Sequence, residues 1–515
     1  MSVIHTPSVE EAHRHRGMIT LSIMLATIMQ ALDTTIANVA LPHMQGSLQS
    51  SQDQIMWVLT SYIVAAAIAT PLTGWLCARY GRRRVFLVAV AGFTVASALC
   101  GMATNLGQIV AARLLQGIFG AALVPLSQAV LLDINPREKI GQAMAIWGAG
   151  IMVGPILGPL LGGWLTENMD WRWVFYINLP VGIFAFIGIL RYLPENRPPS
   201  SRLDIFGFVT LSLAIGFLQM FLDRGELKDW FNSPEICIEA IGALVAFTFF
   251  AAHTATVHGS SFFNLKLLRD RNFVTGIVLA FIVGMILYAT MALLPTFLQG
   301  LLDYPVIYTG EVTAPRGIGT MLAMMVVGRI THRVDARAIM AVGFALTAFA
   351  LYQMTHMSLD MDSWLVIESG FIQGLGIGFT FVPLSAAAFA TLPANLRNDG
   401  TPIFSLLRNI GSSVGISIVQ AMLTRNTARA HAEIATSVTA SNPALQSVPQ
   451  LWDPHSPVGL AVLNAEVTRQ AAMVSYLQDF SLMMYLTILA MPLLLLIRKP
   501  KRAPIGGPAN ADAMH

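Results

Sequence analysis

One acidic residue lies inside the first long apolar run of the sequence. Within residues 17–42, Asp33 is the only charged side chain. A run of this length predicts a membrane-spanning helix, and an acid inside such a helix costs roughly 2.5–3.5 kcal/mol on insertion scales. Such residues usually face a cavity or a partner, and burial favours the protonated form of a carboxyl group. We therefore predict that Asp33 binds and releases a proton; the alternative is a structural acid capped by Thr34, Thr35 or Asn38.

A second charged residue is expected near Asp33. Asp33 lies 16 residues into the first run, about 24 Å from its start at 1.5 Å per residue. Arg113 lies about seven residues from the near end of the fourth run, which crosses in the opposite direction. The two charges are thus at similar depth in a core roughly 30 Å thick. We expect Arg113 to tune the proton affinity of Asp33; the alternative is a static brace between helices.

The composition excludes a soluble protein. Of 515 residues, 55% are hydrophobic and 11% are charged, against about 25% charged in soluble domains, and the mean hydropathy is +0.63. Such a chain places its apolar side chains against lipid, which predicts an all-α polytopic membrane protein. The three cysteines have neither disulfide nor metal-ligand spacing, and the sequence contains no phosphate-binding loop. We expect no enzyme activity, no metal or cofactor, no nucleic-acid partner, and a proton gradient as the energy source.

Fourteen apolar runs predict fourteen spans of a lipid bilayer. They lie near residues 17–41, 55–77, 85–104, 107–131, 141–165, 173–193, 204–222, 235–256, 273–298, 307–331, 338–355, 364–390, 401–424 and 478–497. Of the 31 lysines and arginines, 21 fall on the side that both termini share, 6 on the opposite side and 4 inside spans. The positive-inside rule then predicts a multi-pass protein of the cell inner (plasma) membrane with both termini cytoplasmic. The first run is too long for a cleavable signal and is expected to be an anchor.

A weak internal repeat divides the spans into two halves. Gln116-Gly117 recurs as Gln373-Gly374, at an offset near 250 residues. Fourteen spans then divide into six, two and six, and parallel six-helix repeats around a midplane site are one large transporter architecture. The expected parts are a cytoplasmic tail (1–16), an N-terminal six-helix bundle (17–193), two inserted helices (204–256), a C-terminal six-helix bundle (273–497) and a second cytoplasmic tail (498–515).

One segment of the C-terminal bundle is mostly polar. Residues 425–477 are predicted to form a long extracytoplasmic loop between the last two spans. Long loops are often only mobile surface linkers, which is the first interpretation. The second is a docking surface for an extracytoplasmic partner.

Two segments carry a resemblance to a known family. They are Leu32–Pro42 (LDTTIANVALP) and Trp57–Tyr62 (WVLTSY). With them, the chain resembles the EmrB/QacA group of drug:proton antiporters in the major facilitator superfamily, over about residues 21–496. The resemblance implies fourteen transmembrane helices, arranged as two six-helix bundles with two inserted helices.

Three further elements match superfamily patterns. The first is the loop Gly74–Arg83 (GWLCARYGRR), with candidate residues Gly74, Arg79, Gly81 and Arg82; Ala78 stands where the pattern usually has an acid. The second is Arg113–Ala121 (RLLQGIFGA), an element associated with proton transfer. The third is Gly154–Gly163 (GPILGPLLGG), which marks antiporters and contributes Gly154, Pro155, Gly158, Pro159, Gly162 and Gly163.

Spacing adds two expectations for the Gly154–Gly163 element. Glycines at a four-residue period lie on one helix face, where backbones approach closely. Pro155 and Pro159 remove backbone donors and are expected to bend the helix.

Several polar or aromatic residues inside spans are candidates for the substrate cavity or for gating. They are Asn38, Trp57, Tyr62, Gln116, Arg316 and Arg408. Arg316 would favour an anionic or weakly acidic ligand, or pair with a buried acid elsewhere. Glu311 lies five residues before Arg316, so the two do not share a helix face and each requires its own partner.

The resemblance implies a function. It is a proton-coupled multidrug efflux antiporter that exports hydrophobic and amphipathic compounds across the inner membrane. In a bacterium with two membranes, it implies a tripartite system with a periplasmic adaptor and an outer-membrane channel. Two alternatives remain open: a non-transporting membrane sensor or scaffold, and a proton-coupled uptake transporter.

Overall fold

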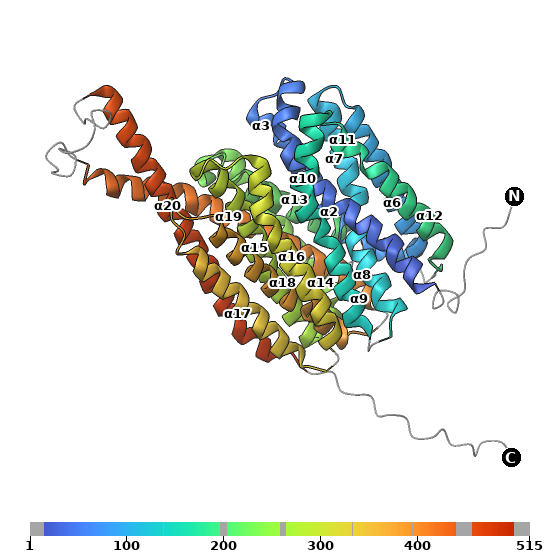
Figure 1. The fold of residues 1–515 in the computed structure, drawn as a ribbon. Helices are drawn as coiled ribbons and strands as arrows, with labels where there is room; N and C mark the ends of the chain where they lie inside the picture. Colours follow the sequence, from blue (N-terminus) through green and yellow to red (C-terminus); the bar gives the residue numbers. More distant parts are fainter. Residues whose placement is uncertain are drawn as a thin grey trace, which may run out of the picture.

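The computed structural model describes residues 15–136, 139–195, 203–257, 264–331, 333–393, 396–438 and 456–498, without the side chains of Gln52, Asp53, Pro155, Pro159, Val306 and Asn398. Its secondary structure is helical throughout these residues (Figure 1). The N-terminal half contains α2 (Arg16–Ser47), α3 (Gln52–Ile55), α4 (Trp57–Ala69), α5 (Leu72–Tyr80), α6 (Arg82–Met102), α7 (Leu106–Gly120), α8 (Leu123–Ile134), α9 (Ile140–Ile151), α10 (Val153–Asn168), α11 (Trp173–Tyr176) and α12 (Asn178–Tyr192). The inserted pair is α13 (Ile205–Arg224) and α14 (Pro234–Thr256), joined by η2 (Trp230–Asn232). The C-terminal half contains η3 (Leu265–Arg269), α15 (Arg271–Leu301), α16 (Val306–Ile330), α17 (Ala336–Met354), α18 (Trp364–Ala390), α19 (Arg397–Ala435), α20 (Pro457–Ala490) and η7 (Met491–Leu496).

Each of the fourteen predicted spans falls on one helix or on two consecutive helices. In the described part of the chain, twelve helices are long and apolar enough to cross a membrane, or thirteen if α4 and α5 form one span bent by 54°. Pro71, which has no backbone N–H, stands at that bend. The remaining span is α16, which has 25 residues but carries Glu311, Arg316 and Arg329. The structure is therefore compatible with fourteen spans.

The inserted helices lie beside the seam between the halves. α13 packs against α4 of the N-terminal half and α19 of the C-terminal half, and α14 packs against α13. Gln219 of α13 exchanges hydrogen bonds of 2.8 and 3.1 Å with Ser413 of α19, and Thr60 of α4 donates to Asp223 of α13. One inserted helix thus contacts both halves through polar side chains.

The hydrophobic cores show where the halves meet. The terminal face of the molecule is the end at which α2 begins and η7 ends (Figure 1). On that side, one cluster combines Phe86 and Ile134 of the N-terminal half with Phe389 and Phe404 of the C-terminal half. Toward the opposite face the described residues form two separate clusters, one in each half. The halves therefore share a core on the terminal side, and α10 also packs against α16 farther from that side.

The prediction of a loop at 425–477 is wrong for most of that segment. α19 continues to Ala435 and α20 begins at Pro457, so both helices extend beyond the rest of the C-terminal half as an arm (Figure 1). His431 Nε2 lies 3.0 Å from Asn464 Oδ1, which pairs the two helices of the arm. Polar residues lower hydropathy without preventing a helix, which is why the apolar runs ended earlier than the helices did.

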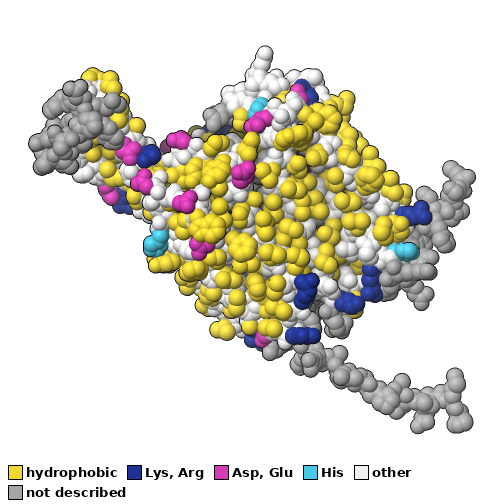
Figure 2. All heavy atoms as spheres, in the orientation of Figure 1, with side chains coloured by type: hydrophobic (Ala, Val, Ile, Leu, Met, Phe, Trp, Pro, Cys, Tyr) yellow, Lys and Arg dark blue, Asp and Glu magenta, His cyan; other side chains and the backbone are white. Residues whose placement is uncertain are grey.

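The surface is divided into bands. Figure 2 shows hydrophobic side chains over the middle of the visible face, blue Lys and Arg spheres toward the terminal face, and acidic spheres toward the opposite side. Apolar side chains that face outward include Val88, Phe184 and Leu244, which are 60%, 68% and 67% exposed. An exposed apolar band of this kind is expected where a helical protein contacts lipid.

Candidate functional site

Three side chains donate hydrogen bonds to the carboxyl group of Asp33. Arg113 Nη1 lies 2.6 Å from Asp33 Oδ2, and Gln116 Nε2 and Asn178 Nδ2 lie 2.8 and 2.9 Å from Oδ1. The side chains of Asp33 and Arg113 are each 1% exposed. An ionised carboxylate only accepts hydrogen bonds, so this set of donors matches its charged form. Helices α2, α7 and α12 thus build one enclosed polar group, the Asp33 cluster.

Arg113 is held on several sides. It shares one face of α7 with Gln116, because the two residues are three apart, and its Nη1 donates to Gln116 Oε1 at 2.9 Å. Its Nε donates to the Val58 carbonyl of α4 at 3.0 Å. The guanidinium carbon lies 4.4 Å from the ring centroid of Tyr62 and 5.6 Å from that of Phe175. These contacts fix the cation beside Asp33 and place two aromatic rings against it.

A second layer orients Asn178, the first residue of α12. Its Nδ2 also donates to Ser97 Oγ at 2.9 Å, and Ser97 Oγ donates to the Phe175 carbonyl at 2.8 Å. Cys100 Sγ lies 3.5 Å from Gln116 Oε1. All of these side chains are buried, so the cluster is closed to solvent in this conformation.

The alternative of an acid capped by its neighbours is wrong. Thr34 Oγ1 donates to the Ala31 carbonyl at 2.9 Å, and Thr35 Oγ1 donates to the Gly154 carbonyl at 3.1 Å. Asn38 is exposed, whereas the donors to Asp33 are buried. Five residues after Asp33, it points to another side of α2. Asp33 is therefore bound by distant helices and not by α2.

The glycines of the Gly154–Gly163 element form a close interface with α2. A Cβ atom added to Gly154 would lie 2.6 Å from the Ala31 carbonyl carbon, and one on Gly158 would lie 2.1 Å from Thr35 Oγ1. One on Gly162 would lie 3.2 Å from Val39 Cβ, whereas Gly163 has nothing within 4 Å. Only glycine fits where α10 passes α2 at this distance. This stripe sets the position of the helix that carries Asp33.

The predicted bend in this element is only partly described. α9 ends at Ile151 and α10 begins at Val153, so the helix is interrupted once, before Pro155. The side chains of Pro155 and Pro159 lie outside the described residues.

The loop element after α5 turns at Gly81, whose φ of 87° is strained for residues with a Cβ atom. Gly74 is buried and Arg79 is exposed. Arg82 Nη2 lies 2.6 Å from Asp133 Oδ2 on α8, and Arg397 Nη1 of α19 lies 3.5 Å from Asp133 Oδ1. Asp133 thus forms a charge contact between the halves, although Ala78 stands where the superfamily pattern usually has an acid.

Of the remaining candidates in the N-terminal half, Tyr62 and Gln116 both contact Arg113, whereas Trp57 contacts an inserted helix. Tyr62 is buried against Arg113, and Gln116 is part of the Asp33 cluster. The guanidinium carbon of Arg224 on α13 lies 5.2 Å from the Trp57 ring centroid. Trp57 therefore contacts an inserted helix.

Two arginines of the C-terminal half lack an acidic partner. Arg316 is 8% exposed, and its Nη2 donates to the Leu287 carbonyl at 3.1 Å. Arg408 Nη2 lies 3.4 Å from Asn409 Oδ1, and its Nε has no hydrogen-bond partner. No acid among the described residues forms an ion pair with either arginine, so the expected alternative of a buried ion pair at Arg316 is wrong for that part of the chain. Glu311 is exposed on another face of α16.

Arg408 also borders the seam between the halves. Its guanidinium carbon lies 5.9 Å from the Phe381 ring centroid. Phe381 stacks on Trp147 of α9, with ring centroids 6.3 Å apart, and Trp147 Nε1 donates to Thr27 Oγ1 at 3.3 Å. The partly buried guanidinium of Arg408 in one half is thereby connected to α2 of the other through an aromatic pair.

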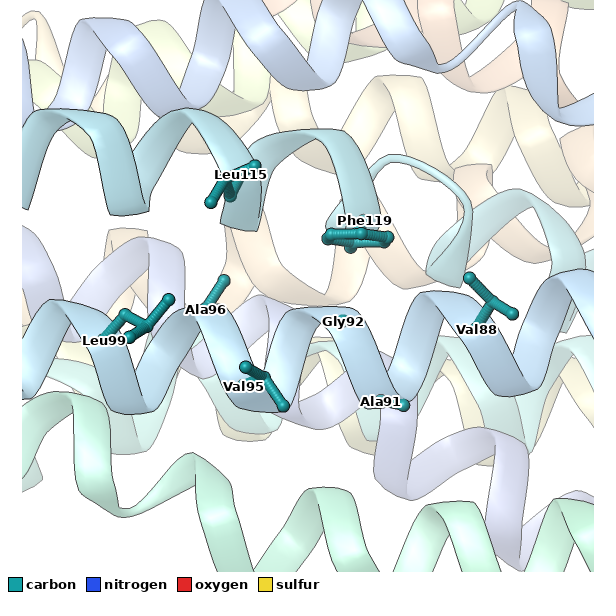
Figure 3. Close-up of a pocket in the computed structure, with 8 residues that line it drawn as sticks. All are labelled: Val88, Ala91, Gly92, Val95, Ala96, Leu99, Leu115 and Phe119. Atoms are coloured by element: carbon teal, nitrogen blue, oxygen red, sulfur yellow. The ribbon is translucent and has the colours of Figure 1, made fainter.

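An apolar hollow on the surface does not coincide with these residues. Figure 3 shows it between α6 and α7, with a volume of about 350 Å³ and only apolar lining. Val88 and Val95 in its wall are each 60% exposed, so it belongs to the outward apolar band. We assign it to lipid contact.

Comparison with known proteins decides the family. The sequence profile of the Major Facilitator Superfamily matches residues 23–416 of the chain. The chain belongs to the major facilitator superfamily. As a member of this superfamily it is a multi-pass membrane transporter and not an enzyme, and the all-helical polytopic architecture predicted from the sequence is confirmed.

Individual relatives narrow the group. The chain is 35% identical to the fatty acid resistance protein FarB of Neisseria gonorrhoeae over 496 residues, covering 95% of this chain and 97% of FarB. It is 36% identical to the multidrug export protein EmrB of Escherichia coli K12 over 434 residues, covering 84% and 85%. The solved human organic anion transporter MFSD10 superposes with a TM-score of 0.58 at 14% identity, covering 93% and 100%, which supports the fold alone. This member of the superfamily is therefore EmrB-like.

Sequence reasoning missed three residues of the site. Asn178 and Ser97 complete the Asp33 cluster, and Asp133 joins the halves. Asn178 and Asp133 lie close to the ends of predicted spans. Polar residues are common there, so their presence does not by itself indicate a functional site. Only their partners on other helices distinguish them.

Proposed function

We propose that the protein is a proton-coupled antiporter that exports hydrophobic and amphipathic compounds across the inner membrane, with both termini in the cytoplasm. The observation that supports this is the Asp33 cluster. A carboxyl group is enclosed within the N-terminal half and held by one cation and two amides. Enclosed ionisable groups in membrane helices are usual in proton relays.

The proposed cycle uses the pairing of Asp33 with Arg113. Binding a proton neutralises the carboxylate and removes its attraction for the guanidinium, which weakens the hold of α7 on α2. The closed terminal face, with its contact between Asp133 and Arg397, is one of the two states. Because Asp33 is enclosed here, proton exchange takes place in the other state. A proton and a substrate that differ in their affinity for the two states suffice to drive such a cycle.

The substrates we propose include lipophilic anions. Two arginines of the C-terminal half, the buried Arg316 and the partly buried Arg408, have no acidic partner among the described residues. A buried cation is stabilised when a ligand brings the opposite charge. The names of FarB and EmrB, which refer to fatty acids and to several drugs, are consistent with this class.

For a cell with two membranes, we further propose a periplasmic adaptor and an outer-membrane channel as partners. The arm formed by α19 and α20 is the candidate docking element, because it extends beyond the rest of the C-terminal half (Figure 1). Removing residues 425–477 should abolish co-purification with the adaptor. Retained binding would exclude the arm as its docking site.

Transport by reconstituted protein tests the main proposal. Vesicles that contain the parent protein should move a lipophilic acid or a dye against its gradient when a pH gradient is imposed, and Asp33→Asn should abolish this. Asp360→Asn, at an exposed position between α17 and α18, is the matched control and should behave as the parent.

Each result has a clear meaning. Equal export by Asp33→Asn and the parent would exclude Asp33 from coupling. Transport that does not respond to the pH gradient would favour a sensor or scaffold. Accumulation of substrate on the cytoplasmic side would favour uptake.

A further inference from the structure

The internal repeat places a second polar group in the C-terminal half. Thr290 and Gln373 each lie 257 residues after Asp33 and Gln116, and they make the corresponding contact: Gln373 Nε2 donates to Thr290 Oγ1 at 3.3 Å. Both side chains are fully buried. The contact between Asp33 and Gln116 is therefore repeated in the C-terminal half, with the hydroxyl group of Thr290 in place of the carboxyl group of Asp33.

The glycines beside the two glutamines support the correspondence. A Cβ atom on Gly117 would lie 2.4 Å from the Tyr62 carbonyl oxygen, and one on Gly374 would lie 1.9 Å from the Arg316 carbonyl oxygen. Gly370 stands 257 residues after Arg113, so the repeat provides no cation at that point. The C-terminal copy of the repeat thus lacks both the acid of α2 and the arginine of α7.

The last span of the C-terminal half, α20, contains a buried acid, Asp479. In the N-terminal half, Asn178 of α12, the sixth span, completes the cluster. The sixth span of the C-terminal half is α20, and it carries Asp479 at 0% exposure. Neither carboxyl oxygen of Asp479 has a hydrogen-bond partner in the structure, and Gln373 Oε1 has none either.

The surroundings of Asp479 are apolar. α20 packs against α15, α17 and α19. The core of these helices includes Phe297, Val419, Phe480 and Met483. An ionised carboxylate without donors in such a place would be very unfavourable, whereas the protonated acid is neutral. The protonated form is therefore the one that fits this conformation.

The titratable and charged groups of the helices packed against α20 do not compensate a charge on Asp479. Tyr476, three residues earlier on α20, interacts electrostatically with Asp479 and bears no charge at neutral pH. The contact of His431 with Asn464 sets the antiparallel register of α19 and α20, which places Arg408 and Arg425 about 12–14 Å along the axis from the level of Asp479.

No described side chain of α15 or α17 donates a hydrogen bond to Asp479. Tyr476 packs on Phe297, and this contact places Tyr288 of α15 about 9 Å along the axis from the level of Asp479. Tyr352 of α17 is 50% exposed and stacks on His356.

We infer that Asp479 is a second proton-binding site, which carries a proton while the terminal face is closed. In the other conformation its O–H bond breaks, the proton passes to water and the electron pair stays on the carboxylate. In the conformation described, the two halves thus hold carboxyl groups of opposite protonation, Asp33 ionised and Asp479 neutral. The coupling of Asp479 to substrate rests on the proposed function; the presence of its proton does not.

Infrared difference spectroscopy of the purified protein tests the proton directly. The parent should show the stretching band of a protonated carboxyl group at neutral pH. Asp479→Asn, a neutral group of similar shape, should remove that band, whereas Asp33→Asn and Asp360→Asn should keep it. Asp479→Leu provides a second variant if the amide folds poorly. A band unchanged in both Asp479 variants would overturn the inference.

Proton counting tests the coupling. In vesicles, protons moved per substrate should fall in Asp479→Asn and recover in Asp479→Glu, which restores an acid. Unchanged stoichiometry in Asp479→Asn would show that its proton is not coupled. Absence of any proton movement by the parent would refute the proposed function, and the infrared band would still decide whether Asp479 holds a proton.

Discussion

The N-terminal and C-terminal halves treat buried charge in different ways. In the N-terminal half, Asp33 and Arg113 are 2.6 Å apart and share hydrogen bonds with Gln116 and Asn178. In the C-terminal half, neither carboxyl oxygen of Asp479 has a hydrogen-bond partner, and Arg316 and Arg408 pair with no acid among the described residues. The repeated helices therefore hold a compensated ion pair in the N-terminal half and uncompensated arginines in the C-terminal half.

This difference indicates that the two halves have different roles in transport. A compensated pair changes its interactions only when a proton arrives, so it is suited to sensing protons. Uncompensated cations gain most from a ligand of opposite charge, so they are suited to binding substrate. The following predictions test the comparison between the halves, from the largest expected effect to the smallest.

Removing the cation of the compensated pair should have the largest effect. Arg113→Met leaves the buried carboxylate of Asp33 unpaired and should lower the free energy of unfolding by about 3–5 kcal/mol, measured by detergent-induced unfolding. Arg408→Met removes a cation with no acidic partner and should cost much less. Adding Asp33→Asn to Arg113→Met should recover stability. Equal losses in the two single variants would contradict the contrast between the halves.

The two glutamines of the repeat, Gln116 and Gln373, should contribute differently to the free energy of unfolding. Gln116→Leu removes a hydrogen bond to a charged group and should cost about 1.5–3 kcal/mol, whereas Gln373→Leu removes one to a hydroxyl group and should cost about 0.5–1.5 kcal/mol. The same unfolding measurement compares them at matched burial. A larger loss at Gln373 would indicate that the C-terminal cluster is the more strongly bound.

A methyl group on the glycine stripe should disturb the helix that carries Asp33. Gly158→Ala would force Thr35 to move and should cost about 1–3 kcal/mol, together with reduced transport. Gly163→Ala, five residues later on α10, has open space at its Cβ position and serves as the control. In the C-terminal half, Gly415 passes the Met285 carbonyl oxygen similarly closely, so Gly415→Ala should also destabilise. If Gly158→Ala and Gly163→Ala gave the same stability, the close approach would be refuted.

The smallest effect is expected at the contact between the halves. Asp133 is partly exposed, and its pairing with Arg82 and Arg397 should contribute about 0.2–1 kcal/mol to closure. Asp133→Asn should raise the rate at which a maleimide labels Cys77, a buried thiol of α5 near the terminal face, in a chain whose other two cysteines are serine. Asp360→Asn should leave the rate unchanged. No increase in Asp133→Asn would exclude this contact from closure.

Much of the site could be predicted because membrane helices restrict position along one axis. Counting residues from span ends placed Asp33 and Arg113 at similar depth, and the structure brings them into contact. Rotation about the helix axis and the choice of neighbouring helix are not fixed by such counting. That is why Asn178 and Asp133 were missed, and why Asp479, next to the predicted start of the last span, was not recognised as buried.

Hydropathy also misjudged the arm. Residues 425–435 and 457–477 are polar enough to leave the bilayer, and the sequence therefore predicted a loop where α19 and α20 continue as helices. Hydropathy reports transfer into lipid, whereas a helix requires only that its backbone hydrogen bonds form.

The sequence by itself determined that this chain crosses a membrane many times, that its spans form a repeat, and that one acid lies inside the first of them. These properties depend on local sums of transfer free energy and on spacing, both of which can be read along the chain. Only the tertiary structure decided which buried charges are compensated. A hydrogen bond forms within about 3 Å, and no distance along a sequence states which side chains of separate helices come that close.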